Sequence, residues 1–476
     1  ADQRLLSVFG LIYADRGGIN FQRKKYLKDK TMQKDLSQGK VFATMSLFAL
    51  PMLLGNVLQQ AYNVVDTWVV GRFVGAGALA GVGSSFTLMT FLTSILLGLC
   101  MGSGVVFSTC FGRQDEAALK SSVGNSFVLA LAVTAALTAV PLLCVDAIVG
   151  WLNTPAEIFQ LTRDYLYIVF WGIPAIFLYN FFAAYLKAMG NSLAPLVFLG
   201  VSTALNIALD LLFVAVFGWG AAGAAQATVI AQYVAGAAIA LYVCKKSGVV
   251  RDALRHLRPS RAGLRQIAGC SVFTCLQQSV MNLGILMVQG LVNSFGTTVM
   301  AAFAAAVKID SFAYMPAQEY ANAFSTFLAQ NAGAGRADRV KQGVRCAFIT
   351  SLSYCAAASL ALWILAEPLM QIFVAPTETQ IIWEGVRYLR IEGAFYCGIG
   401  LLFLLYGLYR ALGKPAMSLA LTIVSLGTRV VLANVLAAIP SIGVVGIWWS
   451  VPIGWFLADV TGLCALRLVK RAGLGR

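Results

Sequence analysis

The sequence predicts an all-α membrane protein whose twelve transmembrane helices form two pseudo-symmetric six-helix lobes. Three observations support this prediction. The 476 residues are 59% hydrophobic and only 12% charged, whereas a soluble protein of this length carries roughly twice that charge. Apolar stretches that reach the length of about 20 residues needed to cross a bilayer recur along the whole chain. The chain also contains an internal duplication, whose two copies lie 223 residues apart over most of their length.

In the first half, long apolar runs such as 127–144 and 193–217 lack the alternation of barrel strands, so they are predicted to be helices. The turn sequence 217–220 separates the run 193–217 from the span that follows it. Pro51 lies inside the first span, where it can kink the helix and act as a gate, or simply be tolerated. The expected spans lie near 41–72, 79–110, 121–145, 162–187, 193–217 and 221–244.

The second half repeats this organisation, with turn signals at 293–296 and 440–443. Its expected spans lie near 264–293, 297–328, 341–365, 384–410, 416–438 and 443–468. Six spans return the chain to its starting side, so both copies insert with the same polarity, as parallel repeats with a cleft between them. The predicted division is a polar tail or non-native extension (1–35), an N-lobe (36–244), a cytoplasmic linker (245–263) and a C-lobe (264–476).

Short motifs identify the duplication. The matching segments are Lys187-Ala-Met-Gly190 with Arg410-Ala-Leu-Gly413, Trp219-Gly-Ala-Ala-Gly223 with Ile442-Gly-Val-Val-Gly446, and Leu58-Gln59-Gln60 with Leu276-Gln277-Gln278. A duplicated polytopic unit is typical of secondary transporters, which place substrate and ion sites at or between their repeats.

Basic residues predict the orientation. They concentrate in the linker 245–263 and the loops on its side of the membrane, whereas the opposite loops hold carboxylates such as Asp146 and Glu378. The positive-inside bias therefore predicts a multi-pass protein of the inner (plasma) membrane with both termini cytoplasmic. The net charge of +15 reflects this topology and attracts anionic membrane lipid. Because the charges are dispersed over short loops, we expect no nucleic-acid partner. We also expect the protein to be a monomer.

Several classes of site lack the residues they need. The ten cysteines contain no CxxC pair and lie mostly inside spans, as small buried hydrophobic residues do. The one histidine, His256, lies in the linker, so a histidine-based metal site is not expected. We expect no cofactor. An intramembrane enzyme stays a remote alternative, supported only by a pair of aspartates.

The two copies differ most in their polar residues. In the first copy several spans carry carboxylates and polar partners that the second copy replaces. The pairs are Asp66 with Gly284, Asp210 with Ala433, Asn206 with Arg429, Thr228 with Val451, Tyr62 with Val280, and Asn180 with Phe403. The first lobe therefore holds the candidate ion site.

Depth supports grouping these residues. Asp66 and Asp210 each lie seven residues before the outer end of a span, and Thr228 lies seven residues after the start of another. At a rise of 1.5 Å per residue, all three lie roughly 10 Å below the outer surface. Asn206 lies one turn from Asp210, on the same helix face. Tyr165 is shallow enough to reach this level.

On the first span, Gln59 and Tyr62 share the face of Asp66, whereas Asn180 is deeper on the fourth helix. Interhelical hydrogen bonding explains Gln59, Tyr62 and Asn180 equally well.

A lone aspartate in the hydrocarbon centre costs about 2.5–3.5 kcal/mol. Two that lie together cannot both stay ionised, so the pair Asp66 and Asp210 can take up and release H⁺. Alternatively, a set of oxygens can hold Na⁺ as a metal ligand shell. That set is Asp66, Asn206, Asp210 and Thr228.

Charged residues also occur in the spans of the second half, and they are expected either to line the cleft and steer substrate or to pair with one another. They are Lys308, Asp310, Glu319, Glu392, Arg429 and Asp459.

The chain resembles the multidrug and toxic compound extrusion (MATE) family over about residues 40–470. The resemblance rests on Leu50-Pro51, Tyr62-Asn-Val-Val-Asp66-Thr67, Gly190-Asn191, Met315-Pro316-Ala317 and Ala329-Gln-Asn-Ala-Gly-Ala-Gly-Arg336. It implies two six-helix lobes around a central V-shaped cleft, and export driven by H⁺ or Na⁺ antiport.

Within that family the chain is similar to the DinF-like branch. This resemblance implies a cation site at Asp66, Asn206, Asp210 and Thr228, and a proton network or substrate-binding set at Gln59, Tyr62, Tyr165 and Asn180. An asparagine expected three residues after Asn180 is Ala183. The acidic pair of the NorM-like branch is replaced by Gln277 or Gln278 and by Ile399, so that site is not expected.

We therefore predict a secondary active antiporter that exports small, amphipathic, cationic organic compounds in exchange for H⁺ or Na⁺ by alternating access. The alternative within the same superfamily is a flippase for lipids or lipid-linked glycans. An arginine-lined cleft would favour the flippase, and the acidic first lobe does not.

Overall fold

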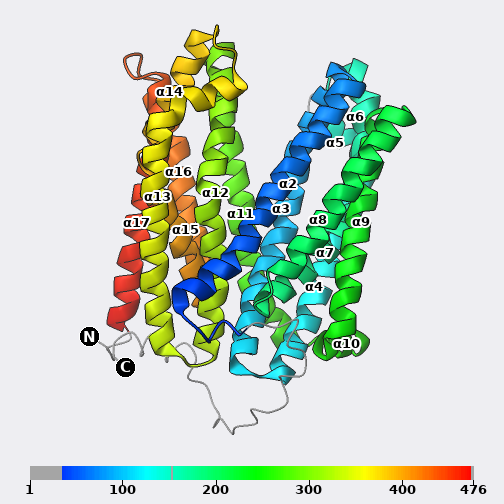
Figure 1. The fold of residues 1–476 in the computed structure, drawn as a ribbon, viewed down its shortest axis with the longest axis vertical. Coiled ribbons are helices and arrows are strands. Elements are labelled where there is room, and N and C mark those ends of the chain that lie inside the picture. The colour runs from blue at the N-terminus through cyan, green and yellow to red at the C-terminus, as the bar shows by residue number, and fades with distance from the viewer. Residues whose placement is uncertain (1–34, 152–153, 473–476) are drawn as a thin grey trace. The chain divides into compact units, whose positions relative to one another are not determined.

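The computed structural model describes residues 35–151 and 154–472, and this part of the chain is helical without a β-strand. The predicted tail lies outside the described residues, apart from Asp35. Eleven helices are long and apolar enough to span a membrane, and a bent pair supplies the twelfth span. The predicted all-α architecture with twelve spans is therefore confirmed (Figure 1).

The helices of the first repeat follow the predicted spans to within a few residues, except near the fourth. They are α2 (Val41–Phe73), α3 (Ala76–Arg113), α4 (Glu116–Leu143), α5 (Val145–Trp151), α6 (Ala156–Phe170), α7 (Ile173–Ala188), α8 (Leu193–Asp210), the π-helix η2 (Leu211–Val216) and α9 (Gly220–Lys246). The helix α10 (Gly248–Arg255) lies in the linker. Short helices such as α5 and α10 were not predicted, because they lack the long apolar run that marks a span.

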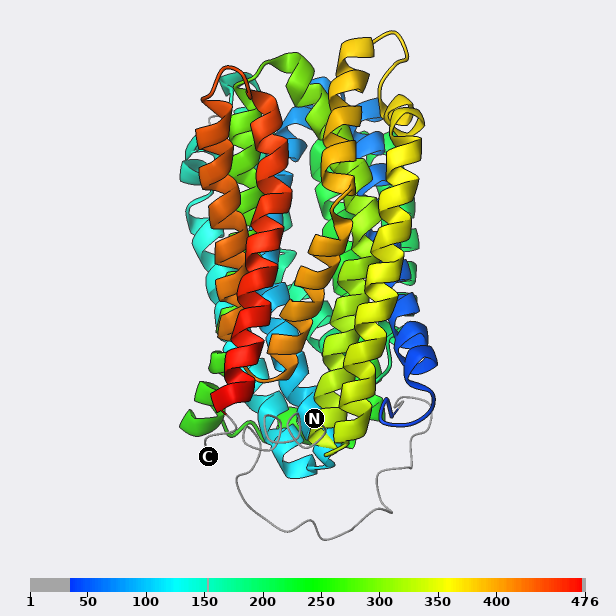
Figure 2. The same cartoon turned by 90° about the vertical axis from the view of Figure 1, so that its left-hand side faces the viewer.

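The second repeat consists of α11 (Arg261–Asn293), α12 (Thr297–Gly333), α13 (Ala337–Phe373), α14 (Thr379–Gly393), α15 (Tyr396–Ala411), α16 (Pro415–Ala437) and α17 (Val444–Ala472). The axes of α14 and α15 differ by 52°, so their span is broken in its middle (Figure 2). The sequence predicted one continuous helix there, because the apolar run continues across the break.

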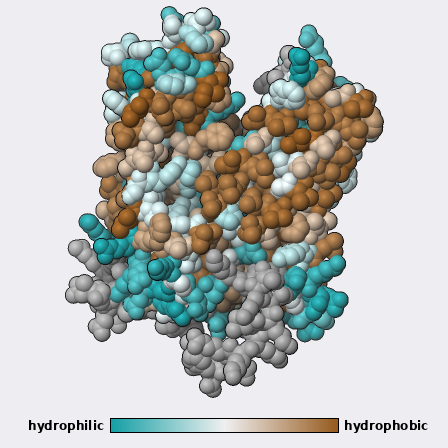
Figure 3. Space-filling view, viewed as in Figure 1, coloured by the Kyte–Doolittle hydropathy of each residue, from teal (hydrophilic) through white to brown (hydrophobic). Residues whose placement is uncertain are grey.

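Two compact units make up the described chain. The N unit is Leu50–Cys275, and the C unit combines Leu36–Ala49 with Leu276 to the end of the described chain. The helices α2 and α11 are thus each divided between the units, Pro51 lying just inside the N unit portion of α2. On the face of the N unit drawn in Figure 3, hydrophobic residues cover the middle, and hydrophilic residues gather at the end near α10.

Small residues set the helix packing in the N unit. A Cβ atom added to Gly98 of α3 would lie 2.4 Å from the Cα atom of Cys275, and one added to Gly102 would lie 2.5 Å from the Cα atom of Ser271. The hydroxyl groups of Ser103 and Ser271 are 3.1 Å apart at this contact. Such close backbone approach is how helices associate in a membrane, where apolar burial from water supplies no driving force between them.

The segment before α2 is fastened within the C unit. The Arg339 guanidinium donates hydrogen bonds to the carbonyl oxygens of Leu36, Gln38 and Gly39, at 2.7–3.1 Å. Arg336 donates to the Ser37 carbonyl at 3.0 Å. Because these carbonyl groups precede the helix, where no regular helical bond reaches them, the arginine donors hold the segment from which α2 begins.

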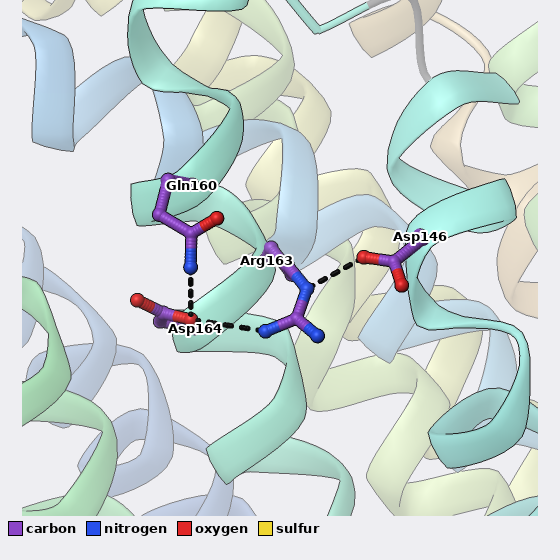
Figure 4. A network of polar contacts seen from close by, with 4 residues as sticks. All are labelled: Asp146, Gln160, Arg163 and Asp164. Carbon is purple, nitrogen blue, oxygen red and sulfur yellow. Dashed lines mark hydrogen bonds and ion pairs between the residues drawn. The ribbon is translucent and has the colours of Figure 1, made fainter.

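A polar network fastens α5 to α6 in the N unit (Figure 4). The Arg163 Nε atom donates to Asp146 Oδ1 at 2.5 Å, and Asp164 Oδ1 accepts from Gln160 Nε2 at 3.0 Å. The four side chains are at least partly exposed, and they hold the start of α6, the helix that carries Tyr165.

Candidate functional site

The helix α8 changes its geometry at Asp210. This aspartate is the last residue of α8, and the π-helix η2 follows it directly. The amide of Phe217 accordingly bonds to the carbonyl of Leu212, five residues back. Single π turns inside helices occur frequently at functional sites. The equivalent helix of the second repeat, α16, is a regular α-helix from Pro415 to Ala437, so this feature belongs to the first repeat.

Three helices meet at the hydroxyl group of Thr228 on α9. Its Oγ1 atom accepts a hydrogen bond from Tyr62 Oη of α2 at 3.1 Å and another from Asn206 Nδ2 of α8 at 3.3 Å. Thr228 and Asn206 are buried, at 8% and 1% exposure. Because a hydroxyl oxygen has two lone pairs, Thr228 can accept both bonds and still donate its own hydrogen.

The same place gathers acceptor oxygens that have no hydrogen-bond donor. They are Asp66 Oδ1, Asn206 Oδ1, and both carboxylate oxygens of Asp210, which is fully buried. Asp66 lies within electrostatic reach of Asp210, and Asn206 lies beside Asp210, one turn earlier on the same helix. Buried polar atoms in folded proteins are almost always paired, because an unpaired one costs about 1–3 kcal/mol. Four unpaired acceptors in one place therefore favour a bound positive charge.

Tyr165 of α6 belongs to this cluster, since it lies within electrostatic reach of Asp66, Tyr62 and Asp210. Gln59 and Asn180 are placed differently. Gln59 is exposed on α2, and Asn180 donates to the carbonyl of Ile176 in its own helix at 2.9 Å. The structure thus brings together six of the eight predicted polar residues, whereas Gln59 faces outward and Asn180 bonds within its own helix.

The donor set determines which ions suit the site. Within the described part of the chain, no group of three or more His, Cys, Asp or Glu residues can hold a metal ion. Transition metals prefer nitrogen and sulfur ligands, whereas carboxylate, amide and hydroxyl oxygens suit hard cations. The oxygens of Asp66, Asn206, Asp210 and Thr228 therefore suit Na⁺ as a transported ion, or a proton on one carboxylate.

The second lobe also holds a cluster of charged residues, taken from those expected either to line the cleft or to pair with one another. In the C unit, Asp310 and Glu392 are both buried, and Arg429 and Asp310 lie within electrostatic reach of Glu392. Sequence comparison of the copies missed this cluster because its carboxylates come from helix positions that do not match Asp66 or Asp210.

Lys308 and Glu319, which share one face of α12 by spacing, have different surroundings. Lys308 is exposed, whereas Glu319 is buried and accepts a hydrogen bond from Asn322 at 3.1 Å. Asn322 in turn accepts one from Arg410 at 2.9 Å. Glu319 therefore belongs to a buried polar group with α15, and Lys308 does not.

Comparison with known proteins agrees with the duplication and the fold. The MatE family model matches two segments, residues 51–212 and 271–435. The probable multidrug resistance protein YpnP of Bacillus subtilis is 30% identical over 391 residues, covering 82% of this chain and 87% of that protein. The probable multidrug resistance protein NorM of Thermotoga maritima is 27% identical over 428 residues, covering 88% and 90%. A crystal structure of MATE in complex with MaL6 superposes with a TM-score of 0.86 at 22% identity, covering 93% of this chain and 99% of that one.

Proposed function

The chain belongs to the MatE family, and on this premise we propose that it exports amphipathic, cationic organic compounds in exchange for H⁺ or Na⁺. The family makes it a multi-pass membrane transporter and not an enzyme. The names of the relatives YpnP and NorM, both probable multidrug resistance proteins, support organic compounds as the substrate class.

One observation carries the proposed coupling: the unpaired acceptor oxygens of Asp66, Asn206 and Asp210. Asp210 is fully buried and Asp66 half-buried, and two such aspartates at one place rarely both stay ionised without a cation, so the site binds either Na⁺ or a proton. Thr228 holds Tyr62 and Asn206 beside it. Pro51 lies on α2, the helix that carries Asp66, and is proposed as a kink that lets this helix change shape.

Transport then follows from alternating access. With an ion bound, the net negative charge of the N unit site falls from two to one, which lowers the cost of the conformational change. Without it, the two carboxylates attract a cationic substrate, so ion and substrate replace each other. At a membrane potential of about 100 mV, each charge moved supplies about 2.3 kcal/mol, enough to sustain a concentration ratio of roughly fiftyfold.

The proposal places the protein in the plasma (inner) membrane of the cell, as a monomer in contact with lipid, with both termini cytoplasmic. The basic linker supports this orientation: Lys245, Lys246, Arg251 and Arg255 lie at the end of α9 and on α10 and are exposed. Under the positive-inside bias such a cluster faces the cytoplasm.

The test is efflux of a fluorescent organic cation, ethidium, from proteoliposomes under an imposed pH or Na⁺ gradient. Asp66→Asn and Asp210→Asn are expected to abolish gradient-driven efflux. The matched control is Glu157→Gln, which removes an exposed carboxylate from the first turn of α6 and is expected to transport normally. Coupled efflux that survives both site variants would refute the proposed site, and scrambling of a glycan-linked lipid without ethidium efflux would favour a flippase.

A further inference from the structure

The C unit contains a buried charged cluster, two of whose residues occupy positions equivalent to residues of the N unit site. Tyr388 follows Tyr165 by 223 residues, and Arg429 follows Asn206 by the same 223 residues. This is the offset that separates the matching motifs of the two repeats. The cluster therefore occupies the same helices of the second repeat, α14 and α16, as Tyr165 and Asn206 occupy in the first, α6 and α8.

Two carboxylates lie in this cluster, and each accepts a hydrogen bond from a tyrosine. Tyr388 Oη donates to Glu392 Oε2 at 2.8 Å, and Tyr396 Oη donates to Asp310 Oδ1. Asp310 is 6% exposed and Glu392 2%. The other oxygen of Glu392, Oε1, is buried without a hydrogen-bond donor, and the nearest Arg429 nitrogen is 4.0 Å away. At that distance the two groups form an ion pair but no hydrogen bond.

The cluster lies near the middle of its spans. Residue 315 is the centre of α12, 395 the centre of the broken span from α14 to α15, and 426 the centre of α16. Asp310, Glu392 and Arg429 lie within five residues of these centres, or roughly 8 Å along a helix. Glu392 and Tyr396 also flank the 52° break between α14 and α15. Broken helices at mid-membrane depth are where transporters hold ions.

The surroundings of Glu392 supply one fixed positive charge. The titratable groups around it are Asp310 and Tyr314 on α12, Tyr388 on its own helix, Tyr396 on α15, Arg429 on α16, and, near the start of α15, Cys355 on α13 and Asp459 on α17. The neighbouring cations of α12, α14 and α15 have other surroundings: Lys308 is exposed, and Arg410 bonds to Asn322. On α14, Arg387 lies 3.9 Å from Glu384, and Arg390 is exposed with its guanidinium over the Trp363 ring.

Charge balance then requires one more positive charge. Two ionised carboxylates and one guanidinium leave a net charge of −1 in a largely buried place. A buried charge without compensation is strongly unfavourable, so such groups neutralise instead. A proton fits this need better than Na⁺, because both carboxylates already accept a tyrosine hydrogen and the guanidinium occupies the cationic side of Glu392.

We propose that Asp310 and Glu392 share one exchangeable proton, for which Arg429 is the built-in counter-ion, so that the C unit carries a proton site of its own. Asn206 in the first repeat is uncharged, so an external cation can bind beside the carboxylates there. The equivalent residue of the second repeat, Arg429, supplies a positive charge of its own, which leaves a proton as the exchangeable ion. This site does not rest on the coupling proposed for Asp66 and Asp210.

The test is infrared spectroscopy of the purified protein, in which a protonated carboxyl group gives a C=O band separate from that of carboxylates. The protein carries Asp66→Asn, Asp210→Asn and Asp459→Asn, so that neither the N unit site nor the buried Asp459 contributes a band. A band is expected that disappears reversibly as the pH rises. Glu392→Gln and Asp310→Asn are each expected to remove it, because one carboxylate beside Arg429 is already neutralised.

Arg429 supplies the decisive comparison. Arg429→Gln is expected to double the band, because two carboxyl groups must then be protonated, whereas Arg429→Lys leaves one. Glu378→Gln, which removes an exposed carboxylate before α14, is the control and leaves the band unchanged. A band that persists in both carboxylate variants, is absent, or does not respond to pH would overturn the proposal. If one carboxylate variant fails to fold, the other and the two Arg429 variants still decide it.

Discussion

Tyr62 donates a hydrogen bond to Thr228, and this contact joins α2 to α9 across 166 residues of sequence. Asn206 bonds to the same oxygen from α8. One hydroxyl group therefore fixes three helices around the carboxylates of Asp66 and Asp210. The precision of the proposed ion site depends on a residue that carries no charge.

Thr228→Val is predicted to destabilise the N unit, since it preserves the side-chain shape and removes the shared acceptor. Tyr62 and Asn206 would keep buried donors without a partner, at a cost of about 1–3 kcal/mol. Thermal unfolding in detergent measures this effect. Thr228→Ser keeps the oxygen and is expected to unfold near the wild-type temperature. Equal melting temperatures for the valine variant and the wild type would contradict the role given to Thr228.

Ion binding at the N unit site is predicted to stabilise the folded protein. A ligand present at about 100 times its dissociation constant contributes about 2.7 kcal/mol, so either Na⁺ (against choline as the control salt) or a lower pH should raise the unfolding temperature. Asp210→Asn should abolish whichever response occurs, because Asp210 holds two of the unpaired oxygens. Glu157→Gln, on the exposed side of α6, should retain it. An unchanged response in Asp210→Asn would remove this residue from the site.

Gly98→Ala is predicted to disturb the contact between α3 and α11. The new Cβ atom would lie 2.4 Å from a backbone atom of Cys275, and backbone cannot move aside as a side chain can. Overpacking of this kind costs about 1–3 kcal/mol, which unfolding in detergent measures. Gly269→Ala on α11 is the control, because nothing lies within 4 Å of its added Cβ atom. A melting temperature for Gly98→Ala as high as that of Gly269→Ala would show that this contact is not tight.

Arg339→Gln is predicted to loosen the segment before α2. The substitution removes donors for the carbonyl groups of Leu36, Gln38 and Gly39, so their backbone should open more often. Hydrogen–deuterium exchange of the peptide that contains residues 36–45 is expected to become at least several times faster. Arg345→Gln, on the exposed face of α13, should leave it unchanged. Equal exchange in the two variants would show that Arg339 does not fasten this segment.

Hydropathy by itself determined the membrane class, the number of spans and most of their ends, because a bilayer of fixed thickness requires apolar runs of fixed length. The polar residues that differ between the two repeats also pointed, without a structure, to Asp66, Asn206, Asp210 and Thr228 as the candidate cation site. Each of these residues lies at a depth that residue counting gives directly, because helices rise by a constant amount per residue.

Only the tertiary structure decided where regular geometry fails and which charges meet. The π turn after Asp210 and the break between α14 and α15 depend on packing against neighbouring helices, which leaves no trace in the local apolar pattern. Asp310, Glu392 and Arg429 come from three helices that are far apart in sequence. Their meeting depends on how those helices are rotated about their axes, and rotation is set by side-chain packing, which hydropathy does not record.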